Sequence, residues 1–287
     1  MIAFNGQYLD KASHGNMRIT AACLGGQWVM HDWLNDATKQ AIIAAFGAEE
    51  GIAVISRTND YLNALALTDQ TRAQQLAMFI NEDPLLVTSL VETSKTRWLV
   101  GDGKAFIRSG IIANDNSGIE LKFRTFTSEN KSTGLLTVDK SANTQAFGVS
   151  RWDGVFVCWY GNQTTESSSI AMSTDITYHY KQNRGKIEIT SSTGKSATKN
   201  FTLGSSSIFA GEFCFPATSR NGNVPTVGGL YEASIVKIWD NDMLVRDFIP
   251  CLYNGENGML DIISGTFHPN ANTEGAFTIA ITDKTHA

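Results

Sequence analysis

The sequence predicts a mainly β protein: an antiparallel β-sandwich or jelly roll in residues 94–287, preceded by a small mixed α/β domain in residues 1–93. Two observations support this division. Apolar residues follow helical spacing in the first part, whereas from about Arg97 onward they alternate with polar residues, as in half-buried strands. The charge divides at the same place, because the first 93 residues carry 5 basic and 10 acidic residues and the remainder carries 18 of each.

Two helices are expected in the first domain. Asn35 or Asp36 can cap the first helix, and Gly47 can end it. Thr68 can cap the second helix, and Pro84 follows its end. The apolar positions of the second helix recur at helical spacing: Ala73, Leu76, Ala77 and Ile80. Short apolar runs at residues 19–24 and 52–55 predict strands.

Short strands separated by turns are expected in the second domain. Residues 119–126 alternate strictly between apolar and polar side chains. Further strands are predicted at residues 155–160, 187–190, 201–203, 234–239 and 277–281. Clusters of Gly, Asn, Asp and Ser lie between them, and these residues favour turns. Many short strands over this length are typical of a sandwich or jelly roll.

Composition excludes several classes of protein. The net charge is −5, whereas proteins that bind nucleic acids through phosphate contacts are usually basic. No apolar stretch is long enough for a membrane span. The first residues lack the basic and apolar regions of a secretory signal. The four cysteines are scattered, which favours free buried thiols in a reducing compartment over disulfides or zinc.

A resemblance to a known family is found near the carboxyl end. Residues 233–251 read ASIVKIWDNDMLVRDFIPC, and residues 258–270 read GMLDIISGTFHPN. Together they resemble the closing segment of concanavalin A-like, laminin-G-type jelly-roll domains. Residues 101–111 are similar to the opening strand of that family, but Arg108 stands where the family usually has Asp. The resemblance covers about residues 97–283 and implies a sandwich that binds glycans or builds surface structures of phages and gut bacteria.

Catalytic and metal-binding patterns are weak. Concanavalin A-like glucanases carry an E-x-D-x-x-E strand, which this sequence lacks, so we expect no enzymatic activity. Asp240 and Asp242 have suitable spacing but flank a predicted hairpin turn. We expect no resident cofactor or metal. Calcium stays open as a ligand, since Asp102, Asp115 and Asp261 could offer oxygens.

Aromatic residues give the best candidate site. Trp152, Trp159 and Tyr160 lie around a turn-rich segment, and Asn162 follows them. A flat aromatic face with planar amides suits a sugar ring, whose C–H groups stack while its hydroxyls form hydrogen bonds. The alternative is that every second side chain of residues 155–160 packs in the sandwich core.

The leading hypothesis is a bacteriophage virion structural protein, made in the host cytoplasm, that serves as a fibre head or as a capsid or tail decoration. Domains of this type normally work outside cells, yet the sequence shows neither an export signal nor a disulfide pattern. Residues 1–93 would dock to other virion proteins, the sandwich would bind host-surface glycans, and we expect a homotrimer or another homo-oligomer. The alternatives are a non-viral glycan-binding adhesion protein of a gut bacterium and a polysaccharide-degrading enzyme.

Overall fold

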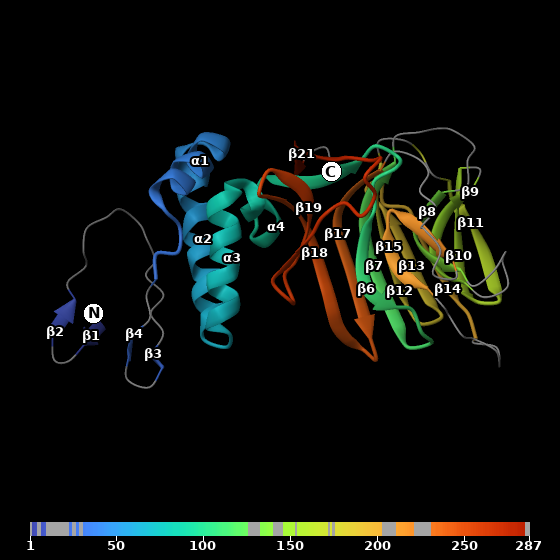
Figure 1. Ribbon diagram of the computed structural model, residues 1–287, viewed down its shortest axis with the longest axis horizontal. Coiled ribbons are helices and arrows are strands. Elements are labelled where there is room, and N and C mark those ends of the chain that lie inside the picture. Colours follow the sequence, from blue (N-terminus) through green and yellow to red (C-terminus); the bar gives the residue numbers. More distant parts are fainter. Residues whose placement is uncertain are drawn as a thin grey trace.

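The computed structural model describes residues 2–4, 7–9, 23–24, 27–28, 31–125, 133–139, 146–152, 154–171, 173, 176–202, 211–220 and 231–284. Within them, a β-sandwich follows a group of helices along the chain (Figure 1). Two short hairpins precede the helices: β1 (Ile2–Phe4) with β2 (Gln7–Leu9), and β3 (Cys23–Leu24) with β4 (Gln27–Trp28).

The helices are α1 (Asp36–Phe46), α2 (Ala48–Ala66), α3 (Gln70–Glu82), a 3-10 turn η1 (Pro84–Leu86) and α4 (Val87–Leu90). The predicted limits of the first helix are confirmed. The side chain of Asn35 accepts a hydrogen bond from the Thr38 N–H, and Gly47 ends α1 at a φ of 81° that few other residues adopt.

Two local predictions in this region are wrong. Asp69, rather than Thr68, caps α3, because its carboxylate accepts from the Arg72 N–H at 3.0 Å. Residues 52–55 form part of α2 and not a strand. A run of four apolar residues does not distinguish the two structures, and the longer pattern of buried positions, from Gly51 to Leu62, has helical spacing.

Two sheets form the sandwich. The ten-stranded sheet has the order β14 (Ser196–Asn200), β13 (Lys186–Ser191), β12 (Thr177–Asn183), β7 (Ser117–Thr125), β17 (Tyr231–Asp240), β18 (Met243–Tyr253), β19 (Glu256–Asp261) and β20 (Thr266–His268), with β5 (Lys95–Gly101) paired to β17 and to β21 (Phe277–Asp283). The five-stranded sheet has the order β11 (Gln163–Ala171), β10 (Val155–Gly161), β9 (Ala146–Trp152), β8 (Thr133–Asp139) and β16 (Ala217–Arg220). β15 (Glu212–Phe215) pairs with β6 (Ile107–Ile112).

The main core lies between these sheets, as the alternation predicted. Ile119, Leu121 and Phe123 of β7 point into it and are at most 1% exposed. Gly118 and Glu120 alternate with them on the outer face. The β-sandwich is thereby confirmed, although one predicted strand is wrong: residues 201–202 lie beyond the end of β14, and residue 203 lies outside the described part of the chain.

A second core joins the helices to the outer face of the ten-stranded sheet. Ile249 and Cys251 of β18 and Leu260 of β19 pack in one cluster with helical residues that include Val54 and Ile80. Figure 1 shows the helices beside this end of the sandwich, with α4 nearest to it. This part of the sheet is therefore covered on both faces, and the helices and the sandwich share a hydrophobic core.

The cysteines match expectation where they are described. Cys158, Cys214 and Cys251 are free and buried. Burial raises the pKa of each of these thiols to about 12, so they stay protonated at neutral pH. The side chain of Cys23 lies outside the described residues. None of the described helices has both the length and the apolar character needed to cross a membrane.

We propose that residues 94–287 fold by themselves as a soluble β-domain, because every described residue of the main core comes from that range. The fragment loses the helices that cover Ile249, Cys251 and Leu260. We therefore expect a β-type circular dichroism spectrum with a Tm below that of the full chain. A spectrum typical of helix or coil would show that the sandwich depends on the first 93 residues for its fold.

Candidate functional site

The residues predicted to bind a sugar do not form one surface. Trp159 and Tyr160 are neighbours on β10, so their side chains point to opposite faces of the five-stranded sheet. Tyr160 lies in the main core, and its hydroxyl donates to the Asp115 carbonyl at 3.0 Å. Trp159 is 8% exposed and packs with Ala146 on the other face. A single sugar ring cannot contact both aromatic side chains.

The other two predicted residues lie at strand ends. Asn162 is exposed in the turn between β10 and β11. Trp152 is the last residue of β9, and its side chain lies outside the described residues. Tyr160 thus packs in the core, as the alternative predicted, whereas sugar binding through Trp152 stays a prediction.

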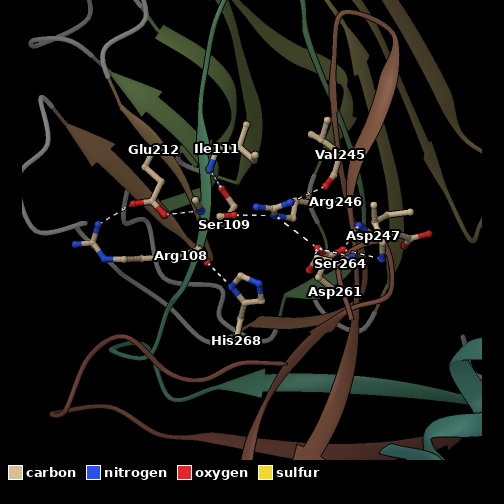
Figure 2. A network of polar contacts seen from close by, with 12 residues as sticks. Arg108, Ser109, Ile111, Glu212, Val245, Arg246, Asp247, Asp261, Ser264 and His268 are labelled. Carbon is tan, nitrogen blue, oxygen red and sulfur yellow. Dashed lines mark hydrogen bonds and ion pairs between the residues drawn. The ribbon is translucent and has the colours of Figure 1, made fainter. Parts of the chain in front are cut away.

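The segment that resembles the jelly-roll family holds strands together. Figure 2 shows the carboxylate of Asp261, which is fully buried, at the centre of several hydrogen bonds. It accepts from the backbone N–H of Asp247, of Ile263 and of Ser264, and from the Ser264 hydroxyl. Arg246 Nε lies 3.7 Å from this carboxylate and donates to the Ser109 carbonyl at 2.9 Å. These residues fix the turn after β19 and join β18 to β6.

The rest of this network is also structural. Glu212 of β15 accepts from the Gly110 N–H at 2.7 Å and from Arg108 at 2.9 Å (Figure 2). His268 Nδ1 lies 3.0 Å from the Arg108 carbonyl, and its ring meets Phe248 edge to face. Burial lowers the pKa of His268 below its usual value. Arg108, which departs from the family pattern, therefore pairs β6 with β15.

The aspartates considered for calcium or catalysis have protein partners. Asp102 accepts from the backbone N–H of Lys104, of Ala105 and of Ala276. Burial raises the pKa of Asp102, but these hydrogen bonds outweigh burial and the net shift is downward. Asp240 accepts from Asn114 at 2.9 Å, next to the turn at residues 241–242. Within the described ranges, no three His, Cys, Asp or Glu side chains are placed to share a metal ion.

One hollow lies at the helical end and has no tryptophan in its lining. It measures about 740 Å³ and lies between the α1–α2 junction and residues 92–94. In the lining of this hollow, the carboxylate of Glu50 accepts hydrogen bonds from both the N–H and the hydroxyl of Ser94. The backbone hydrogen bond from Ser94 lowers the pKa of Glu50. Phe46, the one aromatic residue in the lining, has its ring centroid 6.0 Å from the Lys95 ammonium.

A groove of about 420 Å³ on the outer face of the ten-stranded sheet has a different lining. Trp239 of β17 pairs with Gly118 of β7, and Gly118 pairs with Asn183 of β12. Asn183 pairs with Lys186 of β13, which completes a row across four strands. Because paired residues share a face, these side chains border one surface. Trp239 is half-buried, and Asn183 and Lys186 are exposed.

Glycine forms the floor of this groove. A Cβ at Gly118 would lie 3.4 Å from the Trp239 Cβ and 3.3 Å from the Gln182 carbonyl oxygen. Neighbouring strands are about 4.8 Å apart, so Trp239 and Asn183 stand about 10 Å apart across the glycine. The absence of a side chain at residue 118 leaves room between an indole and an amide.

Charged side chains form a second row beside the first. Glu120 pairs with Lys181, and Lys181 pairs with Glu188. Burial raises the pKa of Glu120, but the hydrogen bond with His179 and the charge of Lys181 outweigh it, so the net shift is downward. The hydrogen bond from Lys186 lowers the pKa of Glu188. Both carboxylates are therefore ionised at neutral pH and can accept hydrogen bonds.

Asp242 of the groove lining forms an ion pair with a residue of a neighbouring turn. Arg184 lies in the turn between β12 and β13, and Asp242 lies in the turn between β17 and β18. Arg184 Nη2 donates to Asp242 at 2.8 Å, which bridges the two turns. The groove thus has an indole, an amide, carboxylates and ammonium groups around a glycine floor. This set of groups can stack on a ring and bind its hydroxyls.

Sequence analysis missed this groove, although one local pattern pointed to it. Val236 and Ile238 face the core, so the alternation of residues 234–239 places Lys237 and Trp239 on the polar face. A tryptophan on the polar face of a half-buried strand is a candidate binding residue. Its partners Gly118 and Asn183 come from strands far away in the sequence and could not be assigned before the register was known.

No family model matches the sequence, and no curated protein matches it. Among solved structures, a provisionally named carbohydrate-binding protein from Bacteroides ovatus is 12% identical with a TM-score of 0.43, over 67% of this chain and 60% of that one. The enzymatically active domain of tailspike protein 2 from bacteriophage CBA120 is 11% identical with a TM-score of 0.33, over 47% of this chain and 23% of that one. Ruminococcus gnavus IT-sialidase CBM40 is 18% identical with a TM-score of 0.32, over 43% of this chain and 74% of that one.

Proposed function

We propose that this chain is a non-enzymatic, glycan-binding structural protein of a bacteriophage virion, and that the groove at Trp239 holds the sugar. The groove carries the binding part of the proposal, because it combines a half-buried indole, an exposed amide and ionised carboxylates around the floor formed by Gly118. Its volume of about 420 Å³ suits a small ligand.

The virion part of the proposal is supported by the resemblance of residues 233–251 and 258–270 to concanavalin A-like, laminin-G-type domains, which phage structural proteins and gut-bacterial surface proteins both contain. In this role the sandwich projects outward as a fibre head or a decoration of capsid or tail. Residues 1–93 dock to neighbouring virion proteins or hold a homotrimer or another homo-oligomer together. The protein is made in the host cytoplasm and works on the particle. Portal, capsid or tail genes beside its gene would agree with this role, whereas genes for exported surface proteins would contradict it.

Trp239→Ala tests the binding site. We expect at least a tenfold loss of affinity, about 1.4 kcal/mol, because the variant removes the stacking surface from the groove. Binding is measured first on a printed array of bacterial-surface oligosaccharides and then by calorimetry with the best ligand. Met78→Ala is the matched control, since Met78 is an apolar side chain 65% exposed on α3, away from the groove. Its affinity and Tm should equal those of the unmodified protein.

Trp152→Ala separates the two candidate sites. If this variant loses binding while Trp239→Ala retains it, the sugar binds near β9 and the groove assignment is wrong. If the unmodified protein binds no glycan on the array, glycan binding itself is refuted. A large fall in the Tm of Trp239→Ala would mean that the indole stabilises the fold, in which case Trp239→Phe, which retains an aromatic ring, is compared instead.

A further inference from the structure

We propose that the groove at Trp239 selects uncharged sugars over sugars that carry a carboxylate, such as sialic and uronic acids. This inference rests on the proposed function and names the class of glycan. It follows from the charges around the groove, each of which has a partner of opposite sign.

The cations of the groove are all paired with carboxylates. Lys186 Nζ lies 2.6 Å from Glu188, on the same strand. Lys181 Nζ lies 3.6 Å from Glu120, on the adjacent strand. Asp242, which also lines the groove, accepts from Arg184, which lies outside the lining, at 2.8 Å. The two lysines and three carboxylates of the lining therefore all have partners of opposite charge, and no cation of the lining lacks an acid.

The next cation along the sheet is also paired with a carboxylate. Lys237, which pairs with Glu120 across β17 and β7, has its ammonium 3.2 Å from the carboxylate of Asp247. The net shift in the pKa of Asp247 is upward, because burial outweighs the charge and hydrogen bond of Lys237. Lys237 and the two lysines of the groove lining therefore each already face an acid.

A sugar carboxylate entering this groove meets three carboxylates and two ammonium groups in the lining. Binding it would mean displacing Glu188 or Glu120 from a lysine, or leaving two carboxylates side by side, and like charges at close range repel. The net charge of −5 on the whole chain adds a weaker repulsion at low salt. An anionic sugar therefore gains no electrostatic attraction from the groove.

A neutral sugar uses the same groups differently. Each hydroxyl can donate to a carboxylate oxygen and accept from an ammonium or an amide. Glu188 and Asp242 are 45% and 62% exposed, so their outer oxygens can reach a ligand without breaking their ion pairs. Trp239 supplies the stacking face, which depends on the C–H groups of the ring and not on charge. Paired acids and bases beside an indole thus match a polyhydroxyl ring.

The test compares neutral and acidic glycans on the printed array of bacterial-surface oligosaccharides, in which each neutral oligosaccharide is matched by a form bearing sialic or uronic acid. We expect the unmodified protein to bind the neutral form at least tenfold more tightly. Glu188→Gln removes the carboxylate beside Lys186 and keeps the size of the side chain. We expect this variant to reduce the preference at least threefold, since Lys186 becomes free to pair with the ligand.

Glu274→Gln is the matched control, because Glu274 is exposed in a loop outside the groove, and its preference should be unchanged. Equal or tighter binding of the acidic forms by the unmodified protein overturns the inference and leaves glycan binding intact. An unchanged preference in Glu188→Gln also overturns it, because charge pairing at Lys186 would then have no influence on selection. Absence of binding to every glycan refutes the proposed function instead.

Discussion

Asp83→Ala is expected to lower the free energy of unfolding by about 3–5 kcal/mol, the usual result of removing one partner from a buried ion pair. The side chains of Arg97 and Asp83 are only 3% and 7% exposed. Arg97 Nη1 donates to one carboxylate oxygen at 2.9 Å, and Nη2 donates to the other. The second oxygen also accepts from the Leu252 N–H at 2.8 Å. The variant would leave a guanidinium and a backbone N–H buried without this acceptor.

Position in the fold explains why this pair matters. Asp83 ends α3, Arg97 lies on β5, and Leu252 lies on β18. One carboxylate therefore joins the helices to two strands of the ten-stranded sheet, at the edge of the core that the helices and the sheet share.

Urea unfolding followed by tryptophan fluorescence measures the effect. Asp283→Ala is the control, since it breaks the Lys95–Asp283 pair, in which the aspartate is 61% exposed. Exposed pairs contribute less than about 1 kcal/mol. If Asp83→Ala costs no more than Asp283→Ala, the junction between helices and sheet is not held by this ion pair.

The contrast between Asn35 and Asp83 shows what the sequence could predict. The cap at Asn35 depends on its hydrogen bond with Thr38, three residues away, so the limits of α1 could be predicted from adjacent residues. The strand alternation around Leu121 is local in the same way. Asp83, in contrast, has partners 14 and 169 residues away, and no local pattern distinguishes it from an ordinary helix-terminal aspartate.

The candidate site also depends on contacts between residues that are far apart in the sequence. Trp159 and Tyr160 are adjacent in sequence, and adjacency in a strand sends their side chains to opposite faces. Trp239, Gly118 and Asn183 are far apart in sequence and become neighbours only through the register of three strands. Adjacent aromatic residues on a strand therefore do not share one face of a sheet, whereas the face of a single aromatic residue follows from the alternation of its strand.

Asp261→Ala is the second substitution for which a large effect is expected, a loss of at least about 3 kcal/mol in the free energy of unfolding. The fully buried carboxylate accepts from three backbone N–H groups and one hydroxyl. Each buried donor left without an acceptor costs about 1–3 kcal/mol. Ser264→Ala is the control: it removes the hydroxyl donor and keeps the carboxylate with its backbone partners, so about 1 kcal/mol is expected. Both variants are compared by urea unfolding.

Since Asp261 lies outside the lining of the groove, folded Asp261→Ala should bind glycan as the unmodified protein does. Equal losses of stability in the two variants would mean that water replaces the carboxylate at the backbone donors, and the turn after β19 would not need this aspartate.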